Sequence, residues 1–276
     1  LSASFNDDRE VDAARITGAE DEDGWNEMWR SRDGSILEKI IRFPLELKRA
    51  ILPKPPSERG TLILVRHGES VWNANKTFTG WADPDLSERG VREMEHAARL
   101  LLEGGYEIDV VFTSRLKRAI RSAWLLLKEM NQVYLPVFKS WRLNERMYGA
   151  LQGLSKIETA QQLGADLVQE WRGSLHSQPP AVTPADYYWP GHKRQYADLL
   201  SSGEIPLTES LKDCMVRCRP VWEEKIMVEL QNGRNVLVVA HANTLRGLVK
   251  TIDQINDDDI REVAIPTGYV LCLSVA

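Results

Sequence analysis

The 276-residue sequence has few cysteines, no long apolar run and little excess charge of one sign. It contains three cysteines, and Cys214 and Cys218 stand four residues apart in a predicted helix, where disulfide geometry is poor and zinc would lack further ligands. No apolar run approaches the roughly 20 residues that a membrane-spanning helix requires. These absences predict free thiols in a reducing intracellular compartment, either the cytoplasm or an organelle matrix.

The formal net charge of −5 is distributed unevenly along the chain. Residues 1–23 contain eight acids and two bases, a net charge of −6, so the other 32 acids and 33 bases give residues 24–276 a net charge of +1. Residues 24–276 therefore lack the excess of basic residues that general nucleic-acid binding requires. We therefore expect no nucleic-acid partner.

Residues 1–60 are predicted to form an N-terminal extension made of an acidic arm, an amphipathic helix and a proline linker. The chain begins with Leu1, which is compatible with a processed N-terminus. The apolar stripe of residues 36–52 could pack on its own domain, and contact with a membrane surface is the least favoured alternative. A homo-oligomer, or docking on a larger complex through residues 25–52, is the partner hypothesis for this segment.

From Thr61 onward, apolar runs alternate with amphipathic stretches, which predicts an α/β domain over residues 61–276. The predicted strands cover 61–66, 108–112, 133–138, 236–240, 263–265 and 269–274. The predicted helices cover 87–103, 113–130, 155–171, 210–231 with a kink at Pro220, and 244–255. The long irregular stretch 173–207 is of a length that usually serves as a lid or an interaction surface.

The first strand runs directly into Arg66, His67 and Gly68. Open α/β sheets place their ligands at the C-terminal ends of such strands. Arg66 offers a planar fork of donors for phosphate, and His67 is a nitrogen nucleophile usable near neutral pH. Gly68 would let the chain turn sharply and let the backbone approach a ligand.

Two further strands end in the same way. The strand 236–240 leads into His241, so two histidines at the ends of two core strands could face each other across one crevice. The strand ending at Phe112 leads into a helix start that carries Arg118, where backbone amides and the helix dipole favour anions. Together the three strand ends predict a phosphate site.

The run from Arg66 through Asn73 to Trp81, together with Trp141-Arg142-Leu143-Asn144-Glu145-Arg146-Met147-Tyr148-Gly149, resembles the cofactor-dependent phosphoglycerate mutases of the histidine phosphatase superfamily. The resemblance implies a three-layer α/β/α fold whose mostly parallel sheet has one antiparallel strand. It implies the glycolytic interconversion of 3-phosphoglycerate and 2-phosphoglycerate through a phosphohistidine. It also implies 2,3-bisphosphoglycerate as primer and no metal.

The resemblance assigns roles to individual residues. The implied catalytic residues are His67 as nucleophile, Glu145 as general acid and base, and His241, Arg66 and Arg118 around the phosphoryl group. The implied substrate-binding residues are Asn73, Thr79, Gly80, Tyr148, Lys156, Arg172 and Asn243. Without the resemblance, Glu145 and Arg146 would be interpreted as a solvated charge pair.

Three positions depart from the family pattern: Met147 replaces a usual histidine, Gly173 a usual arginine and Ala242 a usual glycine. Family mutases also commonly carry a C-terminal tail beyond the last strand. Two alternatives therefore stay open beside the mutase. One is a phosphatase on small phosphoesters, with water as acceptor. The other is a catalytically retired mutase that serves as a structural subunit of a larger assembly.

Overall fold

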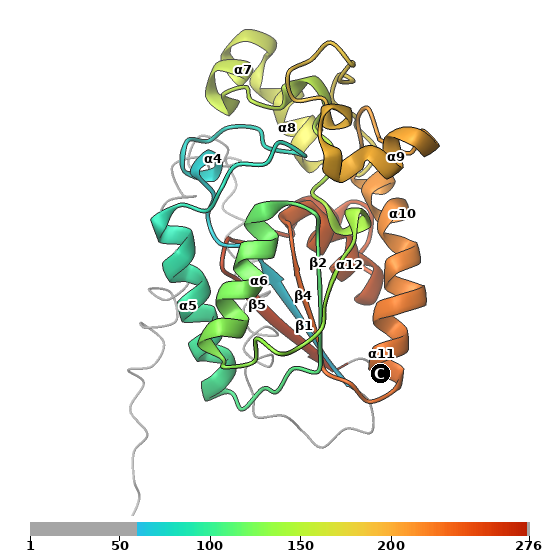
Figure 1. The fold of residues 1–276 in the computed structure, drawn as a ribbon. Coiled ribbons are helices and arrows are strands. Elements are labelled where there is room, and N and C mark those ends of the chain that lie inside the picture. Colours follow the sequence, from blue (N-terminus) through green and yellow to red (C-terminus); the bar gives the residue numbers. More distant parts are fainter. Residues whose placement is uncertain (1–59, 275–276) are drawn as a thin grey trace, which may run out of the picture. The chain divides into compact units, whose positions relative to one another are not determined.

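The computed structural model describes residues 60–274, in which a five-stranded sheet has helices on both faces (Figure 1). The predicted extension, including its docking segment 25–52, lies outside the described residues except for Gly60. The strands are β1 Thr61–Arg66, β2 Val110–Thr113, β3 Val137–Lys139, β4 Val236–Ala240 and β5 Val270–Ser274, in the order β3-β2-β4-β1-β5. Of these, β1 to β4 are parallel and β5 pairs antiparallel with β1, which confirms the predicted fold class.

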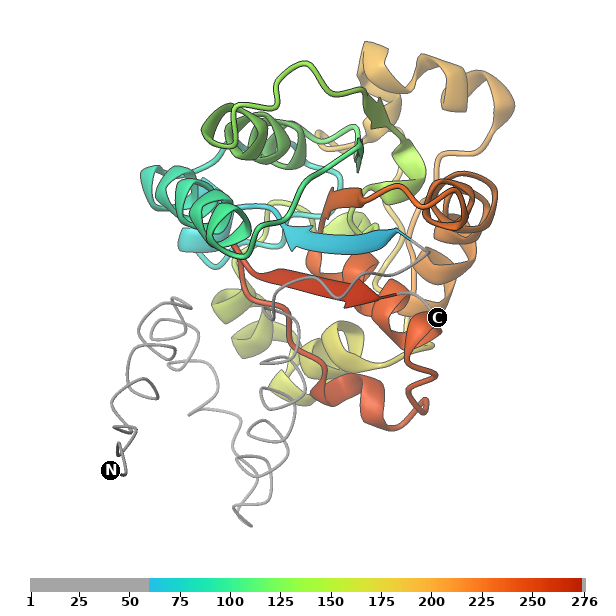
Figure 2. The same cartoon turned by 90° about the horizontal axis from the view of Figure 1, so that it is seen from below.

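Alternate residues of the central strands enter two different cores, which explains their continuous apolar character. In β1, Leu62 and Leu64 pack with the helices α10 Leu211–Val221, α11 Met227–Gln231 and α12 Ala242–Ile252. Ile63 and Val65 face α5 Glu88–Glu103 and α6 Lys117–Glu129 on the other side. Figure 2 shows the sheet between these two helical layers.

The helix boundaries follow local chemistry. The Ser87 hydroxyl accepts a hydrogen bond from the Gly90 N–H at the start of α5, and Gly104 ends that helix, as predicted. The predicted helix 155–171 is instead two helices, α7 Lys156–Leu163 and α8 Ala165–Gly173, because Gly164 between them adopts a φ of +94°. Pro220 lacks an N–H, and a π-helical turn, Trp222–Ile226, follows α10 where the kink was predicted.

Three predicted elements differ from the structure. The strand predicted over 133–138 is confined to β3, because Gln132–Leu135 forms a turn in which the Leu135 N–H donates to the Gln132 carbonyl. The strand predicted over 263–265 is wrong, since this segment follows a short 3-10 helix, Asp259–Glu262, and the Ile265 carbonyl accepts from Arg66. The segment after His67, predicted as a loop, contains the short helix α4 Val71–Ala74.

The segments beyond the C-terminal ends of the parallel strands form a cap, which contains α4, α7, α8 and α9 Ala197–Ser202 (Figure 1). The stretch predicted as irregular, 173–207, contributes α9 and the 3-10 turns Pro190–His192 and Arg194–Tyr196. It packs through an apolar cluster that includes Trp81, Met147 and Tyr196. Among residues 60–274, no helix has the length and apolar character needed to cross a bilayer.

Candidate active site

His67 lies at the C-terminal end of β1 and is 3% exposed. Its Nδ1–H donates to the Gly68 carbonyl at 2.6 Å, because a carbonyl oxygen can only accept. This bond fixes the tautomer and leaves a lone pair on Nε2, which accepts a hydrogen bond from the Arg118 Nε–H at 3.3 Å. The imidazole is therefore held with the lone pair of Nε2 directly beside a guanidinium.

His241, at the end of β4, faces His67, which confirms the predicted pairing of the two histidines. The ring centroids are 4.9 Å apart and the ring planes are inclined by 60°. Nε2 of His241 is 2.8 Å from the hydroxyl of Ser114, and its buried Nδ1 makes no hydrogen bond within residues 60–274. When the Ser114 hydroxyl donates to Nε2, Nδ1 of His241 carries the proton and can donate to an anion. The sequence analysis did not single out Ser114.

Burial keeps both histidines neutral. It lowers the pKa of His67 well below 6.5, and the charges of Arg118 and Arg66 lower it further. Burial also lowers the pKa of His241 well below 6.5, followed by the effects of Arg118 and His67. A neutral imidazole is the form that has a lone pair for nucleophilic attack, and burial favours this form in His67.

We expect the imidazole resonances of His67 and His241 to stay unchanged when the pH is lowered from about 7.5 to about 6, whereas a histidine in a model peptide gains half a proton near 6.5. The direction follows from the sign of the shift, because a lowered pKa delays protonation to more acidic pH. Nuclear magnetic resonance of the ring protons over a pH series measures this. A midpoint at 6.5 or above for either histidine would contradict it.

Arg118 is the second residue of α6 and is 1% exposed. Its Nη1 donates to the Ala82 carbonyl at 3.0 Å and its Nη2 to the Gly80 carbonyl at 2.9 Å. Gly80 adopts a φ of +50°, a conformation that favours glycine, and its carbonyl accepts from Arg118. Burial lowers the pKa of Arg118, while the carboxylates of Glu145 and Asp83 act in the opposite direction.

Arg66 completes the cationic surroundings of the histidines. Its Nη1 donates to the Ile265 carbonyl, which ties the end of β1 to the chain before β5. Gly68 packs closely against the start of α5. A Cβ at this position would lie 2.1 Å from the Gly90 carbonyl oxygen, so glycine is needed for the close packing against the start of α5.

Glu145 is 8% exposed and lies in the segment that follows β3. Its Oε1 accepts from the Arg146 N–H at 2.7 Å, and its charge acts on Arg118. Arg217 of α10 holds the same segment in place. Its guanidinium donates to the carbonyls of Trp141, Arg142, Asn144 and Glu145 at 2.8–3.2 Å. The sequence analysis missed Arg217, because neither the residues next to it nor its spacing from the predicted site residues indicates a role in the site.

Glu209 completes this support. Its Oε1 lies 2.6 Å from Nε of Arg217, and both side chains are almost fully buried, 4% and 5% exposed. Its Oε2 also accepts from the Met147 N–H at 2.8 Å. The Glu209–Arg217 pair therefore clamps both sides of Glu145. Met147 itself is fully buried in the apolar cluster with Trp81, where the family's histidine would have been expected.

Arg146 is fully buried, so the interpretation as a solvated charge pair is wrong for this residue. Its guanidinium lies over the ring of Tyr148 at 4.5 Å, and its three nitrogens make no hydrogen bond within the described part of the chain. Burial would raise the pKa of Tyr148, but Arg146 and Arg172 outweigh it, and the net pKa is lowered. The Tyr148 hydroxyl also accepts from the Asn243 amide at 3.3 Å. The cluster brings together Tyr148, Arg172 and Asn243, three of the residues predicted to bind substrate.

Arg246, one helical turn after Asn243, extends this cationic cluster. Its Nη1 donates to the Asn243 side-chain oxygen at 3.1 Å, and its Nη2 donates to the Ile260 carbonyl at 2.7 Å. Burial lowers the pKa of Arg246 to about 10, and the charge of Arg146 contributes to the same direction. Arg246 orients the Asn243 amide toward Tyr148.

The other predicted substrate residues lie around the cap. The Asn73 oxygen accepts from the Ser70 N–H and hydroxyl in a capping box, which leaves the amide group of Asn73 outside the cap. The Thr79 hydroxyl donates to the Thr77 carbonyl, and the Lys156 ammonium lies 6.0 Å from the Phe78 ring. Ala242, half-buried, begins α12 directly after His241.

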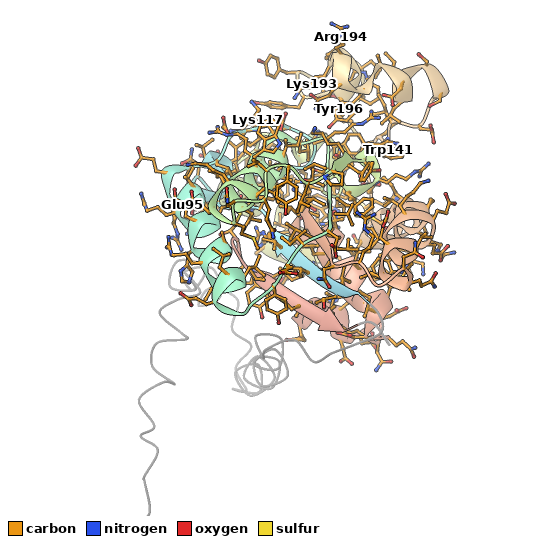
Figure 3. The ribbon with its side chains drawn as sticks, turned by 60° about the horizontal axis from the view of Figure 1, so that its bottom comes forward. Glu95, Lys117, Trp141, Lys193, Arg194 and Tyr196 are labelled. Atoms are coloured by element: carbon orange, nitrogen blue, oxygen red, sulfur yellow. The ribbon has the colours of Figure 1, made fainter. Side chains whose placement is uncertain are left out.

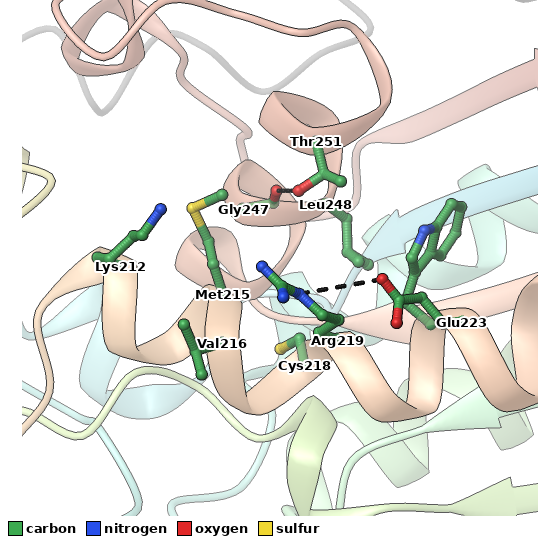
Figure 4. Close-up of a pocket in the computed structure, with 10 residues that line it drawn as sticks. Lys212, Met215, Val216, Cys218, Arg219, Glu223, Gly247, Leu248 and Thr251 are labelled. Carbon is green, nitrogen blue, oxygen red and sulfur yellow. Dashed lines mark hydrogen bonds and ion pairs between the residues drawn. The ribbon is translucent and has the colours of Figure 1, made fainter.

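A separate shallow hollow lies between α10 and α12, away from the histidines (Figure 4). Its volume is ≈ 70 Å³, and Lys212, Met215, Cys218, Arg219 and Glu223 are among the residues that line it. None of the predicted site residues contributes to it. Within residues 60–274, no group of three or more His, Cys, Asp or Glu side chains comes together in a way that could hold a metal ion.

Comparison with known proteins places this geometry in a family. The family model described as "Histidine phosphatase superfamily (branch 1)" matches residues 62–188 and 185–276. A mycobacterial glucosyl-3-phosphoglycerate phosphatase in complex with VO3 is 24% identical, with a TM-score of 0.60 over 78% of this chain and 92% of that chain. A phosphoglycerate mutase from Bacillus anthracis str. Sterne is 23% identical, with a TM-score of 0.57 over 78% of this chain and 88% of that chain. At these identities the two structures show a common fold.

Proposed function

Because the chain belongs to the histidine phosphatase superfamily, branch 1, whose members are phosphoryl-transfer enzymes, we propose that it is a phosphoglycerate mutase acting through a phosphohistidine at His67. The observation that carries the proposal is the pair of buried, neutral imidazoles between Arg66 and Arg118. One imidazole presents Nε2 as a nucleophile, and the other presents Nδ1 to the same space.

In the first step, Nε2 of His67 attacks a phosphorus atom of the primer, 2,3-bisphosphoglycerate. The P–N bond forms and the bond from phosphorus to the leaving oxygen breaks, while Glu145, protonated, gives its proton to that oxygen. Arg118 and Arg66 neutralise the charge that develops on the phosphoryl oxygens, and the neutral His241 donates a hydrogen bond to them from Nδ1. In the second step Glu145 accepts the proton of the free hydroxyl of bound phosphoglycerate, the hydroxyl oxygen attacks phosphorus, and the P–N bond breaks, which forms 2,3-bisphosphoglycerate again.

The buried cationic cluster supports a substrate with a second anionic group. A buried guanidinium is stabilised by a paired anion, and Arg146 lies beside Tyr148, Arg172 and Asn243 with its nitrogens making no hydrogen bond within residues 60–274. The carboxylate of phosphoglycerate would satisfy this cluster while its phosphate lies at His67. By the same argument, 2,3-bisphosphoglycerate fits as primer, with its second phosphate held by Arg146, Arg172 and Tyr148.

A phosphatase reaction is the second candidate function. Gly173 stands where the family's second arginine would hold the glycerate in place for the return transfer. A product that dissociates before the second step leaves the phosphohistidine to water. One protein of the same fold is a glucosyl-3-phosphoglycerate phosphatase, which supports the phosphatase as a candidate.

The deciding experiment incubates the pure protein with 3-phosphoglycerate, with and without 2,3-bisphosphoglycerate, and measures 2-phosphoglycerate and inorganic phosphate in parallel. A mutase yields 2-phosphoglycerate in excess over phosphate, with a rate that rises on priming. A phosphatase yields phosphate alone. A protein that yields neither product and forms no phosphohistidine is a structural homologue, and the proposed function is then wrong.

We expect Gly173→Arg to lower the KM for 3-phosphoglycerate by more than tenfold. A charge-assisted hydrogen bond to a carboxylate typically contributes about 1.5–3 kcal/mol. A Cβ at Gly173 meets only Cγ of Arg261, at 3.8 Å, so a side chain can be accommodated there. Gly173→Gln is the matched control, since it fills the space without adding charge. An unchanged or raised KM would show that another residue already supplies this contact.

A further inference from the structure

Asn144, the residue before Glu145, is fully buried and joins three parts of the fold that surround the candidate active site. Its Oδ1 accepts from the Arg115 N–H at 2.9 Å, and its Nδ2 donates to the Tyr196 hydroxyl at 2.9 Å. Its backbone carbonyl accepts from the Thr244 hydroxyl at 2.7 Å. The phosphoryl transfer proposed above gives Asn144 no role, although it touches the elements that carry the reacting groups.

The bond to Arg115 connects Asn144 with the turn that precedes α6. Arg115 stands three residues before Arg118 and directly after Ser114. The N–H that Asn144 binds belongs to the peptide unit that follows Ser114, whose hydroxyl is 2.8 Å from Nε2 of His241. One hydrogen bond of Asn144 therefore fixes the turn that orients His241 and leads into Arg118.

The bond from Thr244 connects the same residue with α12. Thr244 is 1% exposed and stands three residues after His241. Its hydroxyl donates to the carbonyl of the peptide unit that joins Asn144 to Glu145. The next carbonyl, that of Glu145 itself, accepts from the Nε1–H of Trp81 at 2.7 Å. The backbone on both sides of the Glu145 side chain is thus fixed, which is what a group that must reach a reacting atom requires.

The third partner, Tyr196, belongs to the cap. It is fully buried, and its ring centroid lies 5.0 Å from that of Trp81. Figure 3 shows Tyr196 at the cap end of the molecule. Burial raises the pKa of Tyr196 to about 12, so the hydroxyl keeps its proton at neutral pH and its bond with Asn144 does not change there. The cap is therefore connected to the residue next to Glu145 by a neutral hydrogen bond.

From these contacts we propose that Asn144 is a positioning residue, which holds the Glu145 carboxyl in place relative to the helices of the phosphate site. The cap contributes to this position through the Tyr196 hydroxyl. The inference rests on the proposed phosphoryl transfer, in which the P–N bond to His67 forms, the P–O bond breaks, and the leaving oxygen takes the proton of Glu145. Loss of a bond of Asn144 should slow the departure of an alkoxide, which needs that proton, and spare a leaving group that does not.

The test compares two phosphoryl donors on the full chain. 2,3-Bisphosphoglycerate loses an alcohol that must be protonated, whereas 4-nitrophenyl phosphate loses a stable phenolate that needs no proton. Rapid-quench experiments at saturating donor measure the rate of phosphohistidine formation from each. The variants change the partners of Asn144, because replacing Asn144 itself would leave several buried groups unpaired.

Thr244→Val and Tyr196→Phe each delete one hydroxyl and keep the shape of the side chain. Each should lower the rate from 2,3-bisphosphoglycerate by about tenfold, a part of the 10²–10⁴-fold that general acid catalysis contributes. The rate from 4-nitrophenyl phosphate should stay almost unchanged. Thr244→Ser keeps the hydroxyl and should restore the wild-type ratio of the two rates. Thr251→Val is the matched control, because it deletes a hydroxyl bonded to the Gly247 carbonyl at 2.9 Å in the same helix.

The outcomes separate this inference from the proposed function. Glu145→Gln is the reference, because it removes the proton itself and should show the larger selective loss. A selective loss in Glu145→Gln, with an unchanged ratio or equal slowing of both donors in Thr244→Val and Tyr196→Phe, overturns the positioning role and leaves the proposed function intact. No selective loss in Glu145→Gln, or a wild-type chain that forms phosphohistidine from neither donor, rejects the proposed chemistry and with it the role of Asn144.

Discussion

Replacing His67 with alanine should lower the rate of phosphoryl transfer by on the order of 10⁶-fold, the scale seen when a nucleophile is removed from an enzyme. The reason lies in the hydrogen bonds of the ring. The Nδ1–H of His67 donates to the Gly68 carbonyl, and the Nε–H of Arg118 donates to Nε2. No other nitrogen of the two imidazoles has its lone pair held toward the guanidinium as a nucleophile. His241, with Nε2 occupied by Ser114, cannot replace it without rearrangement.

The measurement should follow the phosphoenzyme itself as well as turnover. Labelled donor should leave acid-labile, base-stable label on the wild-type chain and none on His67→Ala. His176→Ala is the matched control, since His176 is an exposed histidine in the same chain and should retain both label and rate. Label retained on His67→Ala, or normal turnover by that variant, would show that another residue carries the phosphoryl group.

Replacing Arg217 with methionine should destabilise the fold and impair catalysis together. Removing one partner of a buried ion pair leaves the other charge unpaired, at a cost of about 3–5 kcal/mol, which for a domain of this size lowers the melting temperature by roughly 10 °C. Arg217 also holds four carbonyls around Glu145, so the proton-transfer step should slow even in the molecules that remain folded.

The design of this test separates the two effects. Thermal unfolding gives the stability change, and the kcat measured well below the melting temperature gives the catalytic change. Arg219→Met is the matched control from the same helix, because the Arg219 side chain is 65% exposed and its pairing with Glu223 is at 3.9 Å, so its stability should change by at most about 0.5 kcal/mol. The double variant Glu209→Leu/Arg217→Met should be more stable than Arg217→Met alone, since it removes the unpaired carboxylate. If Arg217→Met melts like the wild type with unchanged kcat, the clamp has no role.

The sequence by itself determined where the chemistry lies along the chain. Four consecutive apolar residues before Arg66, and five before His241, predict buried parallel strands, and the ends of such strands gather at one edge of a sheet. The pairing of His67 with His241 followed from that rule alone, although 174 residues separate them. Ser87 and Gly104 likewise fixed the ends of α5 through their own caps, which depend on local contacts only.

The tertiary structure alone decided what these residues can do. The guanidinium that faces Nε2 of His67 belongs to Arg118, 51 residues away, and the orientation of His241 depends on Ser114, 127 residues away. Packing between distant segments buries Arg146 and places Glu209 and Arg217 around Glu145. No pattern in the sequences of these segments indicates that they pack together. Local patterns encode local contacts and periodicity, whereas hydrogen-bond partners, desolvation and pKa shifts depend on which distant segments meet, and these are set only when the cores close.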